Sequence, residues 1–130
     1  MPSLLGHGVD LVELADFGRL AETHGEHGHA RIFTEEELAY AGEGVVRIPR
    51  LAVRFAAKEA VLKALGTGWT TGLSFKDVEV VTAANGAPSI VLSGGVAKLA
   101  SAKGVRQVLI SLTHTRSYAL ASAIAIGAGD

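Results

Sequence analysis

Two carboxylates in the sequence could together hold a divalent metal ion. Asp10 stands near the end of the apolar segment 4–11, and Glu59 lies in the alanine-rich segment 49–65. Two carboxylates with open positions suit Mg²⁺, which keeps water ligands and takes others from substrate phosphates. This chemistry requires the two segments to meet in the fold. The competing interpretation makes Asp10 the N-cap of a following helix, in a capping box with Glu13.

A lysine one helical turn beyond Glu59 could balance its charge. Lys63 follows at the i,i+4 spacing, which places both side chains on one helix face. Small and apolar residues border Glu59 on that face, and a carboxylate partly withdrawn from water needs a compensating cation. Either Lys63 or a metal ion could be that cation. The plainer alternative is a surface Glu–Lys pair worth ~0.3 kcal/mol.

Other polar residues lie at the ends of expected elements. His114 is in phase with apolar residues at the end of a strand, a position typical of a hydrogen-bonded core histidine. The turn 66–68 follows a helix, so it is neither a Walker loop nor a Rossmann fingerprint. Its amides and the Thr67 hydroxyl could still hold a phosphate, helped by Lys63 and Arg54.

Three more histidines, His24, His27 and His29, lie in a glycine-punctuated stretch that we expect to be a loop. Their short, irregular spacing favours adventitious metal binding or none, so they are assigned no role.

The elements that must position these residues follow from hydrophobic periodicity and capping signals. Strands are expected at 4–11, 77–81, 89–92, 108–114 and 118–126, and helices at 12–22, 34 onward, 49–65 and 95–102. Thr34 with Glu37 forms a capping box, Gly66 follows the long helix as its C-terminal cap, and Asn85–Gly86 predicts a hairpin turn. The fold class is α+β, a mostly antiparallel sheet with a long central helix.

Composition excludes several classes of protein. The chain has 130 residues, enough for one domain over residues 1–130, and 48% of them are hydrophobic. A net charge of −1 disfavours nucleic acid as a partner, and the absence of cysteine excludes disulfides and thiolate catalysis. No apolar run reaches the ~20 residues of a membrane span, and no secretion signal is recognised, so we expect a cytoplasmic protein. The small core favours self-association.

Five motifs in order resemble one enzyme family. They are residues 8–12, Phe33–Thr34 with Glu37, 54–60 followed by 63–68, 85–88, and 111–115. Together they make nearly the whole chain similar to the holo-acyl-carrier-protein synthases, the short-chain group of 4′-phosphopantetheinyl transferases. The resemblance implies that coenzyme A donates its phosphopantetheine arm to a serine of an acyl carrier protein. The other product is 3′,5′-ADP, and the reaction supports fatty acid biosynthesis.

The resemblance also implies roles for individual residues. Asp10 and Glu59 would hold Mg²⁺, and Lys63 would stabilise or protonate the leaving phosphate side. The residues implied in coenzyme A binding are Arg54, Lys58, Lys63, Gly66, Thr67, His114 and Thr115. His114, also implied in catalysis, and Thr115 would reach coenzyme A from a neighbouring subunit, so a homotrimer is expected. Glu59 and a metal-bound water are alternatives for the base that deprotonates the serine.

The first helix departs from the family pattern. Asp16 stands where relatives often carry a basic residue that grips the acidic carrier, and only Arg19 remains nearby. A carrier domain of a large multifunctional synthase is therefore an alternative to a discrete carrier. Two other functions stay open: a non-catalytic module that binds coenzyme A or a carrier, and a small metal-dependent nucleotide hydrolase.

Overall fold

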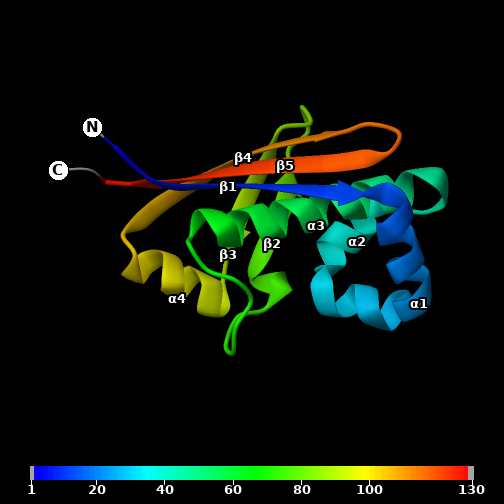
Figure 1. Ribbon diagram of the computed structural model, residues 1–130, viewed down its shortest axis with the longest axis horizontal. Coiled ribbons are helices and arrows are strands. Elements are labelled where there is room, and N and C mark those ends of the chain that lie inside the picture. The colour runs from blue at the N-terminus through cyan, green and yellow to red at the C-terminus, as the bar shows by residue number, and fades with distance from the viewer. Residues whose placement is uncertain (1, 129–130) are drawn as a thin grey trace.

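A long helix, α3 (Arg47–Ala64), lies along one face of a three-stranded antiparallel sheet in the computed structural model, which describes residues 2–128 (Figure 1). The strand order is β1 (Ser3–Glu13), β5 (Tyr118–Gly127), β4 (Val105–His114). The first and last strands along the chain are therefore neighbours, and β5 is central.

A hairpin and three further helices complete the fold. Strands β2 (Val78–Thr82) and β3 (Pro88–Leu92) form a separate hairpin, and α1 (Leu14–Ile32), α2 (Glu35–Ala41) and α4 (Gly94–Ala102) pack around α3 and the strands. Two 3-10 turns, Gly44–Val46 and Phe75–Asp77, connect them. Within residues 2–128 no helix has the length and hydrophobicity to cross a bilayer.

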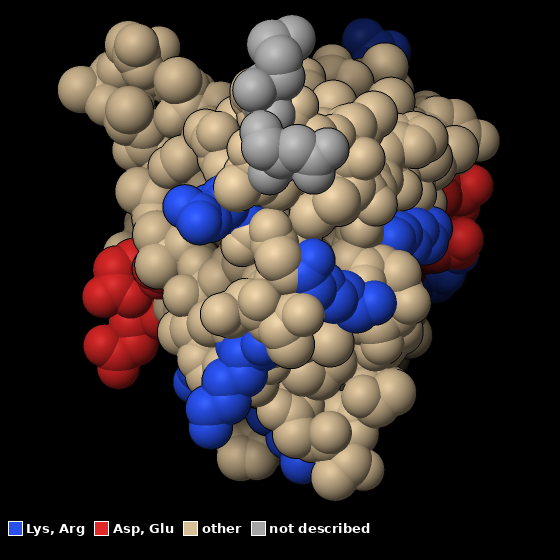
Figure 2. Space-filling model, turned by 90° about the vertical axis from the view of Figure 1, so that its left-hand side faces the viewer, with Lys and Arg blue, Asp and Glu red and all other residues tan. Residues whose placement is uncertain are grey.

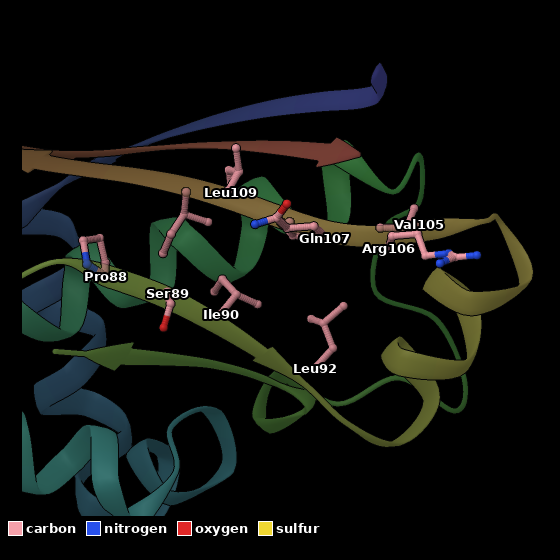
Figure 3. A pocket seen from close by; sticks show the side chains of 10 residues that line it. Pro88, Ser89, Ile90, Leu92, Val105, Arg106, Gln107 and Leu109 are labelled. Atoms are coloured by element: carbon pink, nitrogen blue, oxygen red, sulfur yellow. The ribbon is translucent and has the colours of Figure 1, made fainter. Parts of the chain in front are cut away.

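The hairpin and the main sheet lie side by side without hydrogen bonding to each other. A groove of about 410 Å³ runs between β3 and β4, with Ile90 and Leu92 on one side and Gln107 and Leu109 on the other (Figure 3). None of the residues expected in the site lines this groove.

Glycines in β1 allow the strand to lie directly on α3. A Cβ atom at Gly6 would stand 2.1 Å from the carbonyl oxygen of Ala64, and one at Gly8 would stand 2.2 Å from that of Ala60. The neighbouring strand β5 presents only alanines to the helix, at positions 119, 121, 123 and 125, all fully buried. Small side chains on both strands therefore bring the sheet and α3 unusually close.

The opposite face of the sheet is apolar and uncovered. In the register of β1, β5 and β4, Leu11 pairs with Leu120, and Ile124 lies beside Leu109. These four side chains are between 37% and 62% exposed. Contiguous apolar surface of this kind marks a contact face.

The structure confirms the expected α+β class and the order of helices and strands. It corrects the interpretation of the first helix, which was expected to end near residue 22. Helix α1 continues to Ile32, so His24, His27 and His29 are helical, with one break at Gly25 (φ 61°). The N-cap interpretation of Asp10 is also wrong, because Asp10 lies inside β1 and the helix begins after Glu13.

Candidate active site

The close packing of β1 on α3 brings Asp10 and Lys63 into contact. The ammonium of Lys63 donates to Asp10 Oδ1 at 3.1 Å and to the carbonyl oxygen of Val9 at 2.9 Å. The strand and helix thus meet as the two-carboxylate hypothesis required. The ion pair that Lys63 forms is therefore with Asp10 of β1, and not the surface pair with Glu59 that the plainer alternative described.

Glu59 lies on the same side of α3 and is half-buried. Burial raises the pKa of its carboxyl, and the nearby negative charge of Asp10 raises it further. The hydrogen bond from Trp69 Nε1 to Glu59 Oε1, 3.1 Å long, and the charge of Lys63 lower it. Two carboxylates therefore stand close enough to repel each other, with one lysine beside them.

This donor set fits a hard divalent cation. Such a cation would cancel the repulsion between Asp10 and Glu59, and Mg²⁺ is commonly held by one or two carboxylates plus water and substrate phosphates. Residues 2–128 contain no cluster of three or more His, Cys, Asp or Glu side chains able to bind a metal. The protein would thus supply two ligands and leave the other positions open.

The C-terminal end of α3 carries a glycine cap and lies near a second lysine, Lys103. Gly66 (φ 75°) and Thr67 close the helix, since their amides donate to the carbonyls of Lys63 and Leu62, both at 3.0 Å. This confirms the expected C-terminal cap. The ammonium of Lys103 would be 3.5 Å from a Cβ at Gly66.

The end of the molecule that carries α4 and the chain ends is shown in Figure 2. Lys and Arg are spread over the middle of this face, and Asp and Glu stand at its margins. A ligand with several phosphates would meet a favourable charge distribution there.

Arg54 and His114 line a second site. With Tyr40, Arg50 and Thr82 they border a pocket of about 300 Å³. His114 is exposed, so the core-histidine interpretation is wrong. The pocket therefore combines a histidine with two arginines.

Arg54 itself is only 4% exposed. Its guanidinium lies 4.3 Å from the ring centre of Tyr40 and donates to Thr82 Oγ1 at 2.8 Å. Burial lowers its pKa. Its Nε finds no hydrogen-bond partner among residues 2–128. An anion could use such a donor.

The two groups of residues lie on different sides of α3. Arg54 and Glu59 are five positions apart, which corresponds to about 140° around a helix. The pocket of Arg54 and His114 contains neither Asp10 nor Glu59. One chain thus brings together Asp10, Glu59 and Lys63, and separately Arg54 and His114. Gly66 and Thr67 lie at the C-terminal end of the helix that carries Glu59 and Lys63.

Thr115 lies beside His114 in the turn between β4 and β5. Its hydroxyl accepts from the amides of Ser117 at 3.2 Å and Tyr118 at 3.1 Å. These bonds shape the turn and leave the hydroxyl proton for another partner.

Lys58 is buried and bonded to protein groups, which argues against the expectation that it binds coenzyme A. It is 0% exposed, and its ammonium contacts Glu37 Oε1 at 2.8 Å and donates to the carbonyls of Phe75 and Val78. Burial lowers the pKa of Lys58. This pair joins α2, α3 and β2.

Sequence reasoning identified Glu37 only as a capping residue. It does cap α2, but its carboxylate also accepts from the amide of Val80 at 3.0 Å. One signal was present: Lys58 falls at the helical spacing of Leu51 and Leu62, so it lies on the apolar stripe of α3. A lysine there needs a buried acid. Trp69 was missed entirely as a partner of Glu59.

The first helix carries an internal ion pair. Arg19 donates to Asp16 one turn earlier, and both side chains are exposed. The single basic residue near the start of α1 therefore has its charge offset by a neighbour.

Comparison with known proteins gives a consistent result. A model of the 4′-phosphopantetheinyl transferase superfamily matches residues 6–123. The holo-[acyl-carrier-protein] synthase of Solibacter usitatus (strain Ellin6076) is 40% identical over 121 residues, which cover 93% of this chain and 97% of that protein.

Solved structures agree. The holo-[acyl-carrier-protein] synthase of Neisseria meningitidis superposes with a TM-score of 0.86 at 32% identity, covering 95% of this chain and 98% of the other. A holo-(acyl-carrier-protein) synthase of Bacillus anthracis in complex with CoA (3′,5′-ADP) superposes at 0.78 and 31% identity, covering 96% and 98%. The chain therefore belongs to the 4′-phosphopantetheinyl transferase superfamily and, within it, to the holo-[acyl-carrier-protein] synthases.

Proposed function

We propose that the protein transfers the 4′-phosphopantetheine arm of coenzyme A to a serine of an acyl carrier protein, with Mg²⁺ bound at Asp10 and Glu59. The observation that carries the proposal is the meeting of these two carboxylates with Lys63 at the contact of β1 and α3. The relative in complex with CoA (3′,5′-ADP) supports coenzyme A as the donor.

The reaction is a displacement at phosphorus. The seryl oxygen forms a bond to the β-phosphorus of coenzyme A, the bond from that phosphorus to the bridging oxygen breaks, and 3′,5′-ADP leaves. Transfers of this kind depend on positioning and charge neutralisation more than on covalent chemistry by the protein. Two acceptors are open to the seryl proton: the Glu59 carboxylate and a water bound at the site.

Bound Mg²⁺ would neutralise charge on the pyrophosphate oxygens and orient them. The protein's own residues do the rest. Lys63, half exposed to solvent beside Asp10, stabilises the negative charge that develops on the leaving phosphate. Gly66 and Thr67, in the turn that closes α3 after Lys63, bind the phosphate end of coenzyme A.

We propose that each site is completed by a second copy of the chain. His114 and Arg54 bind coenzyme A from their own pocket, which lies away from Asp10 and Glu59. Thr115, next to His114 in the chain, adds to this contact. The uncovered apolar face of the sheet supports association, and a closed ring of three copies, a homotrimer, would use one such face per chain.

The carrier is either a discrete acyl carrier protein or a carrier domain of a multifunctional synthase. The Asp16–Arg19 pair on α1 reduces the positive charge available to an acidic carrier. We also propose that the reaction supports fatty acid biosynthesis and that the protein acts in the cytoplasm.

The test is a mass measurement on carriers. The protein is incubated with coenzyme A, Mg²⁺ and a panel of apo carriers, both discrete proteins and excised domains. The mass of each carrier is then measured by mass spectrometry. Gain of one phosphopantetheine on any carrier, lost with chelator, supports the proposal. No gain on any carrier refutes it, and release of 3′,5′-ADP without a carrier identifies a hydrolase instead.

Subunit mixing tests the shared site. Glu59→Gln and His114→Ala are each expected to be inactive. When mixed and allowed to exchange subunits, random trimers would hold intact sites at about a quarter of positions, so about a quarter of wild-type turnover should return. No recovery after verified exchange would place both residues in sites of one chain.

A further inference from the structure

We propose that Trp69 is a positioning residue that holds the Glu59 carboxylate in place for the metal ion. The inference rests on the proposed function, since it assigns a support to one of the two metal ligands. It starts from the indole hydrogen bond to Glu59 Oε1 at 3.1 Å.

The hydrogen bond uses one side of the carboxylate only. With Oε1 engaged by the indole N–H, Oε2 remains the oxygen available to a metal ion. A glutamate side chain has several rotatable bonds, and a fixed donor removes the freedom that metal binding would otherwise have to restrict. Groups that orient a ligand in this way sustain metal affinity.

Trp69 can act as a fixed donor because its ring is itself held. It belongs to the irregular segment 65–73 after α3, yet its ring lies 4.0 Å from that of Phe75 and packs against the main core. Phe75 in turn stacks on Phe55 of α3 at 5.8 Å. The ring that holds Glu59 is thus anchored on the helix that carries Glu59.

The aromatic contacts extend beyond the site. Phe55 and Phe75 also line an apolar pocket of about 440 Å³ with Phe17 of α1. Phe17 packs on Phe55 at 5.7 Å, at the far end of this row from Trp69. A change at Phe17 provides a natural control, because it alters packing in the same row but keeps the bond to Glu59 and the Phe75–Phe55 contact that anchors the indole.

The experiment compares Trp69→Phe with Phe17→Leu. Trp69→Phe keeps a ring for Phe75 but removes the N–H, so Mg²⁺ affinity measured by calorimetry without coenzyme A or carrier should fall about 10- to 100-fold. Phe17→Leu should lower the melting temperature and leave Mg²⁺ affinity within about twofold of wild type. Equal Mg²⁺ affinity in Trp69→Phe and wild type would overturn the proposal.

A second measurement needs no change at Trp69. The chain has one tryptophan, so all indole emission comes from this residue. Saturating Mg²⁺ should shift its emission in the wild type, and the shift should vanish in Glu59→Gln. Unchanged emission at a Mg²⁺ concentration that calorimetry shows to be saturating would overturn the proposal, whether or not Trp69→Phe folds.

These readouts separate the inference from the function. If carriers gain phosphopantetheine but Trp69→Phe binds Mg²⁺ as wild type does, the inference fails and the function stands. If no carrier is modified but Trp69→Phe loses Mg²⁺ affinity, the function fails and the role of Trp69 stands.

Discussion

Replacing Gly8 by alanine should separate β1 from α3 and disable the site with one methyl group. The added Cβ would lie 2.2 Å from the carbonyl oxygen of Ala60, 2.7 Å from Lys63 Cβ and 2.8 Å from the amide of Ala64. Two of these three atoms are backbone, so no side-chain rotation relieves the overlap.

The magnitude follows from the geometry. Ordinary contact begins at 3.4 Å, so the strand must move about 1.2 Å to clear Ala60. Overpacking of this kind costs about 3 kcal/mol, the upper end of the usual range, because the obstacle is backbone. In a chain of this length that corresponds to a fall of about 10 °C in melting temperature. Since Asp10 moves with the strand, a displacement of about 1 Å should lower kcat/KM about 100-fold.

The assay is thermal unfolding of Gly8→Ala beside carrier modification. The matched control is Gly18→Ala in α1, where the new Cβ would meet only Ile48 Cγ2 at 3.8 Å. Alanine favours a helix over glycine by about 0.5–1 kcal/mol, so the control should be as stable as wild type or more so. A Gly8→Ala protein that melts and turns over as wild type would refute the close approach of β1 and α3.

Three further outcomes are expected. Lys58→Met leaves Glu37 buried without its cation and should cost about 3–5 kcal/mol in urea unfolding, and a loss below about 1 kcal/mol would contradict the buried pair. Glu59→Gln should raise the melting temperature of the metal-free protein at pH 7, because burial raises the pKa of Glu59 and disfavours its charged form in the folded state. The difference in melting temperature between this variant and wild type should shrink as the pH falls through the raised pKa and the wild-type carboxyl takes up its proton. An equal difference at pH 7 and pH 4 would argue against the raised pKa of Glu59. Leu120→Lys puts a charge on the uncovered sheet face and should reduce the sedimenting mass to that of one chain, whereas an unchanged assembly would exclude this face as the contact.

The sequence predicted features that depend on local chemistry. The capping box at Thr34, the glycine cap at Gly66 and the turn at Asn85–Gly86 each involve residues a few positions apart, and all three are present. The single domain over residues 1–130 and the homotrimer stay predictions.

Features that depend on tertiary contacts could not be predicted from the sequence. Gly25 and Gly28 suggested a loop, but packing of Ala21 and His29 in the interior keeps the chain helical through a single break. The partners of Lys58 and Glu59 come from segments that no spacing rule connects to α3. The pairing of Asp10 with Glu59 was suggested by residue types and implied by the family resemblance, but no spacing in the sequence could show that the strand and the helix meet.

The central place of β5 sets the order in which this protein can fold while it is being synthesised. Both β1 and β4 leave the ribosome before β5, and neither pairs with the other. Until residues 118–127 emerge, β1 has no partner strand and the apolar side of α3 has no complete sheet to cover it. The helices can form early, but the sheet, and with it the place of Asp10 beside α3, must wait for the last strand. Nascent chains that stall before β5 would therefore expose apolar surface and depend on chaperones.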